Sequence, residues 1–299
     1  MKNYKKLRSN LLLVLTAFIW GTGFVAQNMG MDHAGPFSFN ATRNFVGAIA
    51  LLPVIFLFSK INKGKEKTEY KKKDLLVGGA WCGTVLGFAS ALQQLGIYLG
   101  TSSGKAGFIT ALYMLIVPLL GLFLKKKVGF KAWIAVILGT VGMYFLCITS
   151  GFKIEAGDFV IFLCAILYAV HIMVIDHFSP KADGVKMSCI QFLVSGIINV
   201  IIMLIFEDLN LMGLLLSWKA ILYLGIMSSG VAYTLQIVAQ KDTSPVTATL
   251  IMSLESVFAV LSGWLILKET MTQNQLLGCL LIFIGIILSQ LPEKKSTSA

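Results

Sequence analysis

Two ionisable residues stand within long apolar stretches of the sequence, where charges are rare. Arg43 lies in N-A-T-R-N-F and Glu255 lies in L-E-S-V-F. A charge at the centre of a bilayer costs about 2.5–3.5 kcal/mol on insertion scales, so a charge that is retained there is a functional candidate by default. Because desolvation favours the neutral form of a carboxylic acid, we expect Glu255 to take up and release a proton. We expect Arg43 to hold either Glu255 or a bound carboxylate.

Both residues also have a structural interpretation, which the sequence leaves open. Arg43 could extend its long side chain to the nearer membrane surface, beside Asn40 and Asn44. Glu255 could be a protonated, hydrogen-bonded structural acid. At about 1.5 Å per residue, Arg43 lies about 10 Å and Glu255 about 14 Å from the same end of their apolar stretches, so a pair is within reach. In the adjoining hairpin, the small residues at 228–230 fall at the level of Glu255.

Five further residues carry amide, imidazole or aromatic groups that suit the lining of a site for a small polar molecule: Trp20, Gln93, Tyr113, His171 and Gln236. Together with Arg43 they are the candidate substrate-binding residues, and Glu255 is the candidate proton-coupling residue. Such a lining suits a zwitterion and a polar heterocycle alike. Each residue also has a simpler role open to it, because glutamines can bond across helices, Tyr113 can be ordinary packing, and His171 can be a satisfied buried histidine.

The sequence lacks the motifs of nucleotide-binding and membrane-embedded enzymes. Gly21, Gly23 and Ala26 match the dinucleotide fingerprint G-x-G-x-x-[G/A], but no strand pattern precedes them and Arg43 stands about 20 positions later, where an acid is required. There is no HExxH, GxSxG, aspartate pair or Walker A sequence, and the five cysteines show no CxxC spacing. We therefore expect no catalytic residue, metal, disulfide or cofactor, and we assign the glycines to close helix packing.

The composition indicates which elements must position these residues. Hydrophobic residues make up 57% of the chain, charged residues 13%, and the mean hydropathy is +0.82, whereas a soluble domain carries about 25% charge. A helix needs about 20 apolar residues to cross a bilayer. We predict an all-α polytopic membrane protein with ten transmembrane helices, at 11–30, 37–58, 75–98, 104–124, 129–148, 158–176, 187–206, 219–240, 244–267 and 273–291.

The positions of lysine and arginine predict the orientation. With a cytoplasmic N-terminus, twenty of the 25 lysines and arginines fall in cytoplasmic segments and four in external ones, with Arg43 as the remainder. This is a strong positive-inside bias. We predict a multi-pass protein of the plasma (inner) membrane with both termini cytoplasmic. Topology then accounts for the net charge of +11, and the lysine run at 60–73 indicates contact with anionic membrane lipid, not nucleic acid.

The chain contains an internal repeat. The segments 87–93 and 230–236 share G-x-A-x-x-L-Q, and at a similar offset Trp20 corresponds to Tyr168. We place a first five-helix repeat at 1–148 and a second at 149–299. Because five is odd, the second repeat enters the membrane from the opposite side. Inverted repeats of this kind are typical of secondary transporters, whose substrate sites lie between the halves near the membrane midplane.

The residues also resemble a known family. The pattern Trp20-Gly21-Thr22-Gly23-Phe24, the Arg43 of N-A-T-R-N-F, the stretch 254–258 and Lys268-Glu269 are similar to the EamA family of the drug/metabolite transporter superfamily, over essentially the whole chain. The resemblance implies a ten-helix, exporter-like carrier of small metabolites, amino acids among them. Two positions depart from the family pattern: Ser256 stands where a proline is usual, and Lys125-Lys126 where Gly-Glu usually closes the fourth span.

Two classes of function remain. The first is a secondary transporter of small organic metabolites that works by alternating access, with proton coupling through Glu255. The second is a membrane-embedded enzyme or a scaffold that transports nothing. The missing catalytic motifs favour the transporter, which would bind a small-molecule substrate as a monomer or a homodimer and would not be an enzyme.

Cysteine labelling tests the predicted orientation. In a cysteine-free background, single cysteines at positions 65 and 128 should react with a membrane-impermeant maleimide only from the cytoplasmic side, because lysine-rich segments stay in the cytoplasm. A cysteine at position 209 should react only from outside. Labelling of position 65 from outside would contradict the orientation.

Overall fold

The computed structural model describes residues 2–61, 70–101, 103–125, 128–147, 155–267 and 272–291. All regular secondary structure in these residues is helical. The elements are α1 (Lys2–Met31), α2 (Pro36–Ile61), α3 (Lys72–Tyr98), α4 (Ser103–Ala111), α5 (Tyr113–Phe123), α6 (Phe130–Cys147), α7 (Ala156–Phe178), α8 (Gly184–Phe206), α9 (Leu211–Leu216), α10 (Trp218–Tyr223), the π-helix η1 (Leu224–Tyr233), α11 (Thr234–Gln240), α12 (Pro245–Met252), α13 (Leu254–Leu267) and α14 (Gln273–Gln290).

Six helical segments are long and apolar enough to cross a membrane: Pro36–Lys60, Lys72–Tyr98, Lys105–Phe123, Ala156–Phe178, Gly184–Phe206 and Trp218–Gln240. Three shorter apolar helices lie at Phe130–Leu146, Pro245–Leu261 and Gln273–Ser289. The chain is therefore an all-α polytopic membrane protein, as its composition predicts. Each predicted apolar stretch overlaps one or more helices, while the number of ten spans stays a prediction.

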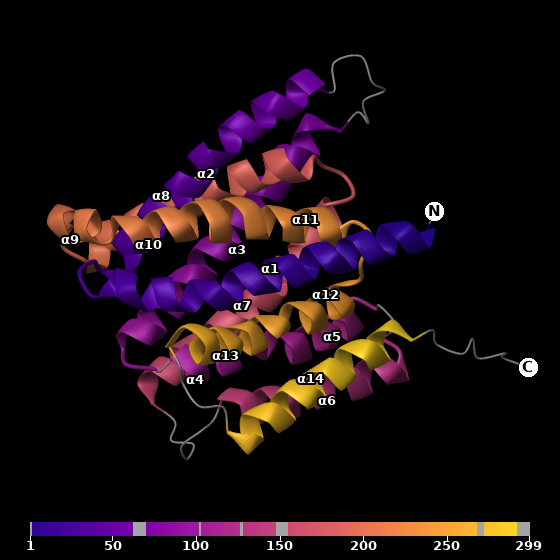
Figure 1. The fold of residues 1–299 in the computed structure, drawn as a ribbon. Coiled ribbons are helices and arrows are strands. Elements are labelled where there is room, and N and C mark those ends of the chain that lie inside the picture. The colour runs from indigo at the N-terminus through magenta and orange to yellow at the C-terminus, as the bar shows by residue number, and fades with distance from the viewer. Residues whose placement is uncertain are drawn as a thin grey trace, which may run out of the picture.

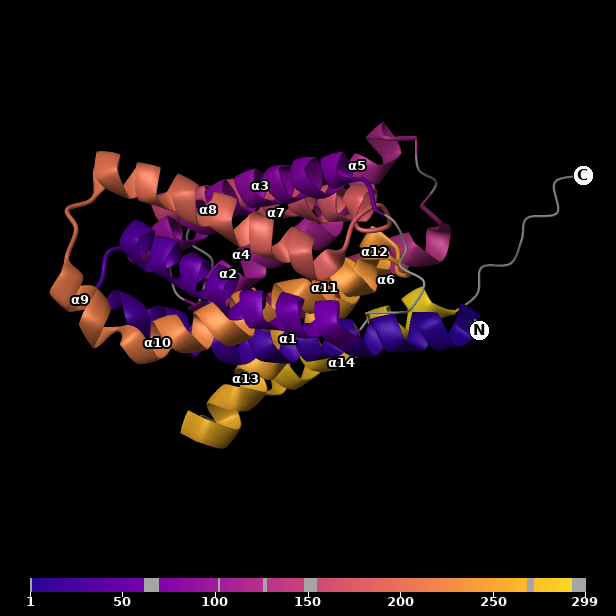
Figure 2. The same cartoon turned by 90° about the horizontal axis from the view of Figure 1, so that it is seen from above.

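The helices run side by side along one direction (Figure 1). The short helix α9 lies at one end of the bundle, and α1 begins at the opposite end, where α14 finishes (Figures 1 and 2). At the end where α1 begins, Lys241 Nζ donates to Tyr70 Oη at 3.3 Å and to the Ala182 carbonyl at 3.0 Å, and Arg8 lies 3.8 Å from Asp242. The described residues of four segments predicted to be cytoplasmic, at Arg8, Tyr70, Ala182 and 241–242, thus meet at one end. Positions 65 and 294–295, also predicted to be cytoplasmic, and positions 268–269 at a predicted external end lie outside the described residues.

Glycines in the transmembrane helices allow close helix contacts. A Cβ atom at Gly21 would lie 2.4 Å from the Glu255 carbonyl oxygen and 2.8 Å from Phe258 Cβ, so α1 touches the backbone of α13. In α3, a Cβ at Gly83 would lie 2.6 Å from the Gln191 carbonyl oxygen on α8. Only a residue without a side chain fits at such separations. The packing interpretation of the G-x-G-x-x-A match at Gly21 is confirmed, and the nucleotide interpretation is wrong, because the match lies inside one helix.

Two of the predicted spans are interrupted. The helical segment 103–123 breaks at Leu112, between α4 and α5, and the segment 245–267 breaks at Ser253, between α12 and α13. At Leu112 the chain makes two bonds of i→i+3 type, from Leu112 N to the Ile109 carbonyl at 3.2 Å and from Leu115 N to the Leu112 carbonyl at 2.9 Å. At Ser253, Ser256 N donates to the Ser253 carbonyl at 3.3 Å. A short 3₁₀ turn within a helix often marks a functional hinge. Hydrophobic periodicity did not predict these breaks.

The packing of α3 on α8 can be tested by substitution. Gly83→Leu should lower the midpoint of thermal unfolding in detergent, because its side chain would collide with the backbone of α8, and overpacking typically costs about 1–3 kcal/mol. Ala80→Leu is the matched control, since Ala80 lies on the same helix but is exposed. Equal midpoints for the two variants would contradict the close contact.

Candidate functional site

A cavity of about 60 Å³ lies among the helices of the bundle. Its lining comes from α1, α2, α3, α4, α5, α7, η1, α11, α12 and α13. All seven residues singled out from the sequence line this one cavity: Trp20, Arg43, Gln93, Tyr113, His171, Gln236 and Glu255. The structure therefore brings the candidates together from distant parts of the chain. That they bind a substrate or carry a proton stays a prediction.

Arg43 and Glu255 are both buried, with exposed fractions of 6% and 5%. Arg43 therefore does not reach the membrane surface, and that interpretation of its long side chain is wrong. The two residues share the cavity but do not form an ion pair. Ion pairs in the described part of the chain include Arg8–Asp242 and Lys105–Asp158, and neither involves a residue that lines the cavity. The cavity thus holds a cationic and an acidic side chain that do not neutralise each other by direct contact.

The surroundings of Arg43 are polar but uncharged. Its side-chain Nε is buried without a hydrogen-bond partner among the described residues, and its closest electrostatic neighbours are the phenols of Tyr168 and Tyr233. A buried guanidinium is stable only when it is paired or hydrogen-bonded. Arg43 therefore offers donors to whatever enters the cavity, and a carboxylate matches these donors best, because a guanidinium binds it with two parallel bonds.

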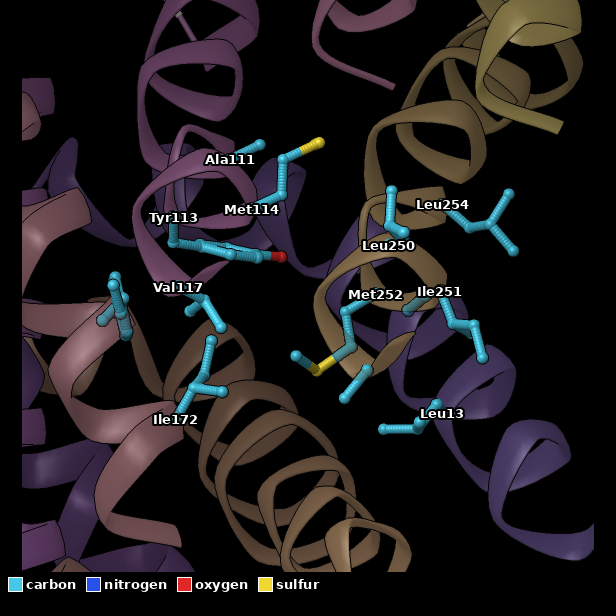
Figure 3. Close-up of a cluster of buried hydrophobic side chains, with 14 of the residues drawn as sticks. Leu13, Ala111, Tyr113, Met114, Val117, Ile172, Leu250, Ile251, Met252 and Leu254 are labelled. Carbon is cyan, nitrogen blue, oxygen red and sulfur yellow. The ribbon is translucent and has the colours of Figure 1, made fainter. Parts of the chain in front are cut away.

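Glu255 lies in the first turn of α13, directly after the break at Ser253. The start of a helix favours a negative charge, because its free N–H groups and dipole are positive there. The phenol of Tyr113 lines the same cavity, and its hydroxyl is buried without a hydrogen-bond partner among the described residues. Figure 3 shows Tyr113 on α5 with its hydroxyl directed towards the helix that carries Leu250 and Met252. The break in the helix therefore places Glu255 at the cavity.

Gln93 connects two helices at the cavity wall. Its side-chain Nε2 donates to Thr110 Oγ1 on α4 at 3.2 Å, and its Oε1 accepts from Tyr168 Oη on α7 at 3.3 Å. Gln236, which corresponds to it in the repeat, donates instead to Gln240 Oε1 at 3.1 Å, and its own Oε1 has no partner among the described residues. Gln93 is thus largely satisfied within the protein, whereas Gln236 leaves an acceptor at the cavity.

Aromatic rings form one wall around Tyr233, the last residue of η1. The ring centroid of Tyr233 lies 4.7 Å from that of Trp20, 5.9 Å from that of His171 and 5.7 Å from that of Phe192. His171 Nε2 is hydrogen-bonded to Gln191 Oε1 at 2.9 Å, so it is a satisfied buried histidine that also lines the cavity. The indole Nε1 of Trp20 is buried without a partner among the described residues. This wall suits an apolar or aromatic part of a ligand.

Several lining residues were not predicted as site residues, among them Gln27, Thr110, Tyr168, Ser228 and Tyr233. Two of them had a signal in the sequence. Tyr168 corresponds to Trp20 in the repeat, and Ser228 falls at the predicted depth of Glu255. Tyr233 had none, because its position depends on the π-helical winding of η1. Within the ranges that the structure describes, no three His, Cys, Asp or Glu side chains are grouped to hold a metal ion.

Comparisons with known proteins agree with this architecture. A curated transporter of Archaeoglobus fulgidus, itself uncharacterized, is 31% identical over 96% of this chain and 87% of its own length. The uncharacterized transporter YoaV of Bacillus subtilis is 24% identical over 93% of this chain and 94% of its own. A chloroplastic WAT1-related protein of Arabidopsis thaliana is 26% identical over 94% of this chain and 69% of its own.

A solved crystal structure shares the fold. It superposes with a TM-score of 0.75 over 94% of this chain and 96% of its own, at 16% identity. The model of the EamA-like transporter family matches twice along the sequence, at residues 7–148 and 155–291. These two matches cover nearly all of the described residues, including every candidate site residue. The chain therefore belongs to the EamA-like transporter family.

Proposed function

We propose that this protein is a secondary transporter that carries small organic metabolites, such as amino acids, across the plasma membrane by alternating access. The observation that carries the proposal is the convergence of Arg43, Glu255 and the aromatic wall on one cavity within the membrane-spanning bundle. A cationic group, an acidic group and an apolar wall in one cavity match a molecule with a carboxylate and a side chain. The relatives named above are described as transporters, which supports the same class of function.

In this proposal, the movement is an exchange of conformations between two inverted five-helix repeats, at 1–148 and 149–299. Reciprocal packing supports it: α7 packs against α4 and α5, and α1 packs against α12 and α13. The helix breaks at Leu112 and Ser253 fall at nearly the same place in the two repeats. Inverted repeats with broken helices at a central site are the architecture of many secondary transporters. The two breaks are therefore the hinge positions of the proposed movement.

The direction and orientation of transport belong to the same proposal. Both termini face the cytoplasm, because the lysine-rich segments gather at the end of the bundle where α1 begins. Transport runs outward, as the family resemblance implies. The protein works without a cofactor, as a monomer or a homodimer in contact with anionic lipid.

Solute flux tests the proposed function directly. The purified protein should carry at least one member of a panel of radiolabelled amino acids and nucleobases by counterflow in proteoliposomes, with and without a proton gradient. Liposomes without protein give the background. A membrane-embedded enzyme or a scaffold would show no flux above that background.

Proton coupling should depend on Glu255. For an anionic substrate, Glu255→Gln should abolish accumulation driven by a proton gradient but retain exchange, because glutamine keeps the shape of the side chain and cannot bind or release a proton. Uptake with an imposed proton gradient and counterflow without one are the two measurements. Accumulation at the wild-type rate in Glu255→Gln would leave this glutamate a structural role only.

Substrate affinity should depend on Arg43. Arg43→Ala should weaken the binding of anionic and zwitterionic substrates most, at least about tenfold, because a charge-assisted hydrogen bond to a carboxylate is among the strongest polar contacts. The measurement is the inhibition of labelled-substrate transport by the unlabelled substrate and by its amide, which lacks the carboxylate charge. The comparison distinguishes binding of the carboxylate from a packing role of Arg43. If Arg43→Ala lowered the affinity for the acid and for its amide equally, Arg43 would only support the fold.

A further inference from the structure

The charges that line the cavity are few enough to be counted. Among the described residues of the lining, Arg43 is the one permanent cation and Glu255 the one carboxylic acid. The other titratable groups there are His171 and the phenols of three tyrosines, Tyr113, Tyr168 and Tyr233. Phenols are neutral near neutral pH, and an imidazole is neutral at slightly alkaline pH. The net charge of the protein around the cavity is therefore set by Arg43 and by the protonation state of Glu255.

No other described residue offsets these two charges. Lys105 and Asp158 neutralise each other at a separation of 2.5 Å and do not line the cavity. The helix of Glu255, α13, packs against α1, α4, α6 and α12. The described residues that these helices contribute to the cavity lining, such as Trp20, Thr110 and Met252, carry no charge. The helix α13 also meets the glycine backbone of α1 at Gly21. A cavity that closes to water must therefore balance its charge with its own two groups, the substrate and protons.

Alternating access requires that the cavity close around its contents in both the empty and the loaded states. An uncompensated charge in a closed, low-dielectric site is strongly unfavourable. The empty cavity is neutral when Glu255 is ionised, because its charge then cancels that of Arg43. With a zwitterion bound, the cavity is again neutral with Glu255 ionised. With a monoanion bound, it is neutral only when Glu255 is protonated.

We infer that the net charge of the substrate decides whether a proton travels with it: a monoanionic carboxylate is carried together with one proton on Glu255, and a zwitterion is carried without one. On loading, the Glu255 carboxylate takes a proton from hydronium and leaves water. On release at the other side, the acid returns that proton to water. One anion and one proton thus move in the same direction. This inference rests on the proposed transport function and assigns its proton-coupled accumulation to monoanions.

Matched pairs of probes separate the two cases. An α-amino acid and the 2-oxo acid with the same side chain differ only in the amino group, as in leucine with 4-methyl-2-oxopentanoate and phenylalanine with phenylpyruvate. In proteoliposomes at slightly alkaline pH, with a pH-sensitive dye inside, the 2-oxo acid should move one proton per molecule and the amino acid none. Neither flux should respond to a potassium diffusion potential. Asp208→Asn, which removes an exposed carboxylate outside the cavity, is the control and should leave both results unchanged.

Substitutions at the two charges give a sharper test, because the charges should compensate each other. In counterflow, Glu255→Gln should retain exchange of the 2-oxo acid without proton movement and reduce exchange of the amino acid about tenfold or more, since the zwitterion leaves Arg43 uncompensated. At saturating substrate, the double variant Arg43→Gln/Glu255→Gln, whose cavity has no charge, should exchange the amino acid faster than Glu255→Gln does, although with the lower affinity that loss of Arg43 brings, and should lose exchange of the 2-oxo acid. A variant that merely fails to fold cannot show this reversal.

Three outcomes would overturn the inference. Equal proton stoichiometry for both members of a pair would do so while leaving transport itself intact. So would equal losses of both members in Glu255→Gln, or the failure of the double variant to recover the amino acid when it still exchanges another solute. The absence of protein-dependent flux for every amino acid, 2-oxo acid and nucleobase would overturn the proposed function as well.

Discussion

The buried guanidinium of Arg43 is the constraint around which the rest of the site is arranged. A permanent charge in an apolar bundle costs several kcal/mol unless other groups compensate it. The protein compensates it only in part, with the phenols of Tyr168 and Tyr233 and with an acid, Glu255, that shares the cavity without forming an ion pair. This incomplete compensation leaves the cavity ready for a carboxylate.

The helix that carries Arg43 is anchored to its neighbours by hydrogen bonds on both sides of that residue in the sequence. At its start, Glu207 accepts from the backbone N–H of Phe37 at 2.8 Å. One turn later, Asn40 Nδ2 donates to the Ser90 carbonyl on α3 at 2.8 Å, and Asn44 Nδ2 donates to Ser195 Oγ on α8 at 2.9 Å. Residues four apart share one face of a helix. The asparagines therefore anchor α2 to α3 and α8 on either side of Arg43 in the sequence.

Those asparagines also show where sequence reasoning succeeded and where it stopped. Composition and the unexpected charges were sufficient to identify a membrane bundle and to select Arg43 and Glu255, because burying a charge in lipid is costly in any fold. The interpretation of Asn40 and Asn44 as companions of an arginine at the membrane surface is wrong. Their true partners, Ser90 and Ser195, lie on other helices, and no spacing within one segment can identify them. The glycine packing was predictable, whereas the contacts that each glycine makes were not.

The position of Tyr233 depends on the winding of one helix. In an α-helix, residues five apart differ in direction by about 140°, so Ser228 and Tyr233 would face different surroundings. In η1 the bonds run from residue i to i+5, and residues five apart fall on nearly the same face. Ser228 and Tyr233 therefore both line the cavity. Close packing accompanies this wider turn, because a Cβ at Gly225 would lie 2.5 Å from Val46 Cγ1 on α2. The winding of the π-helix thus places the aromatic ring of Tyr233 beside Arg43. In an α-helix the same residue would point in another direction.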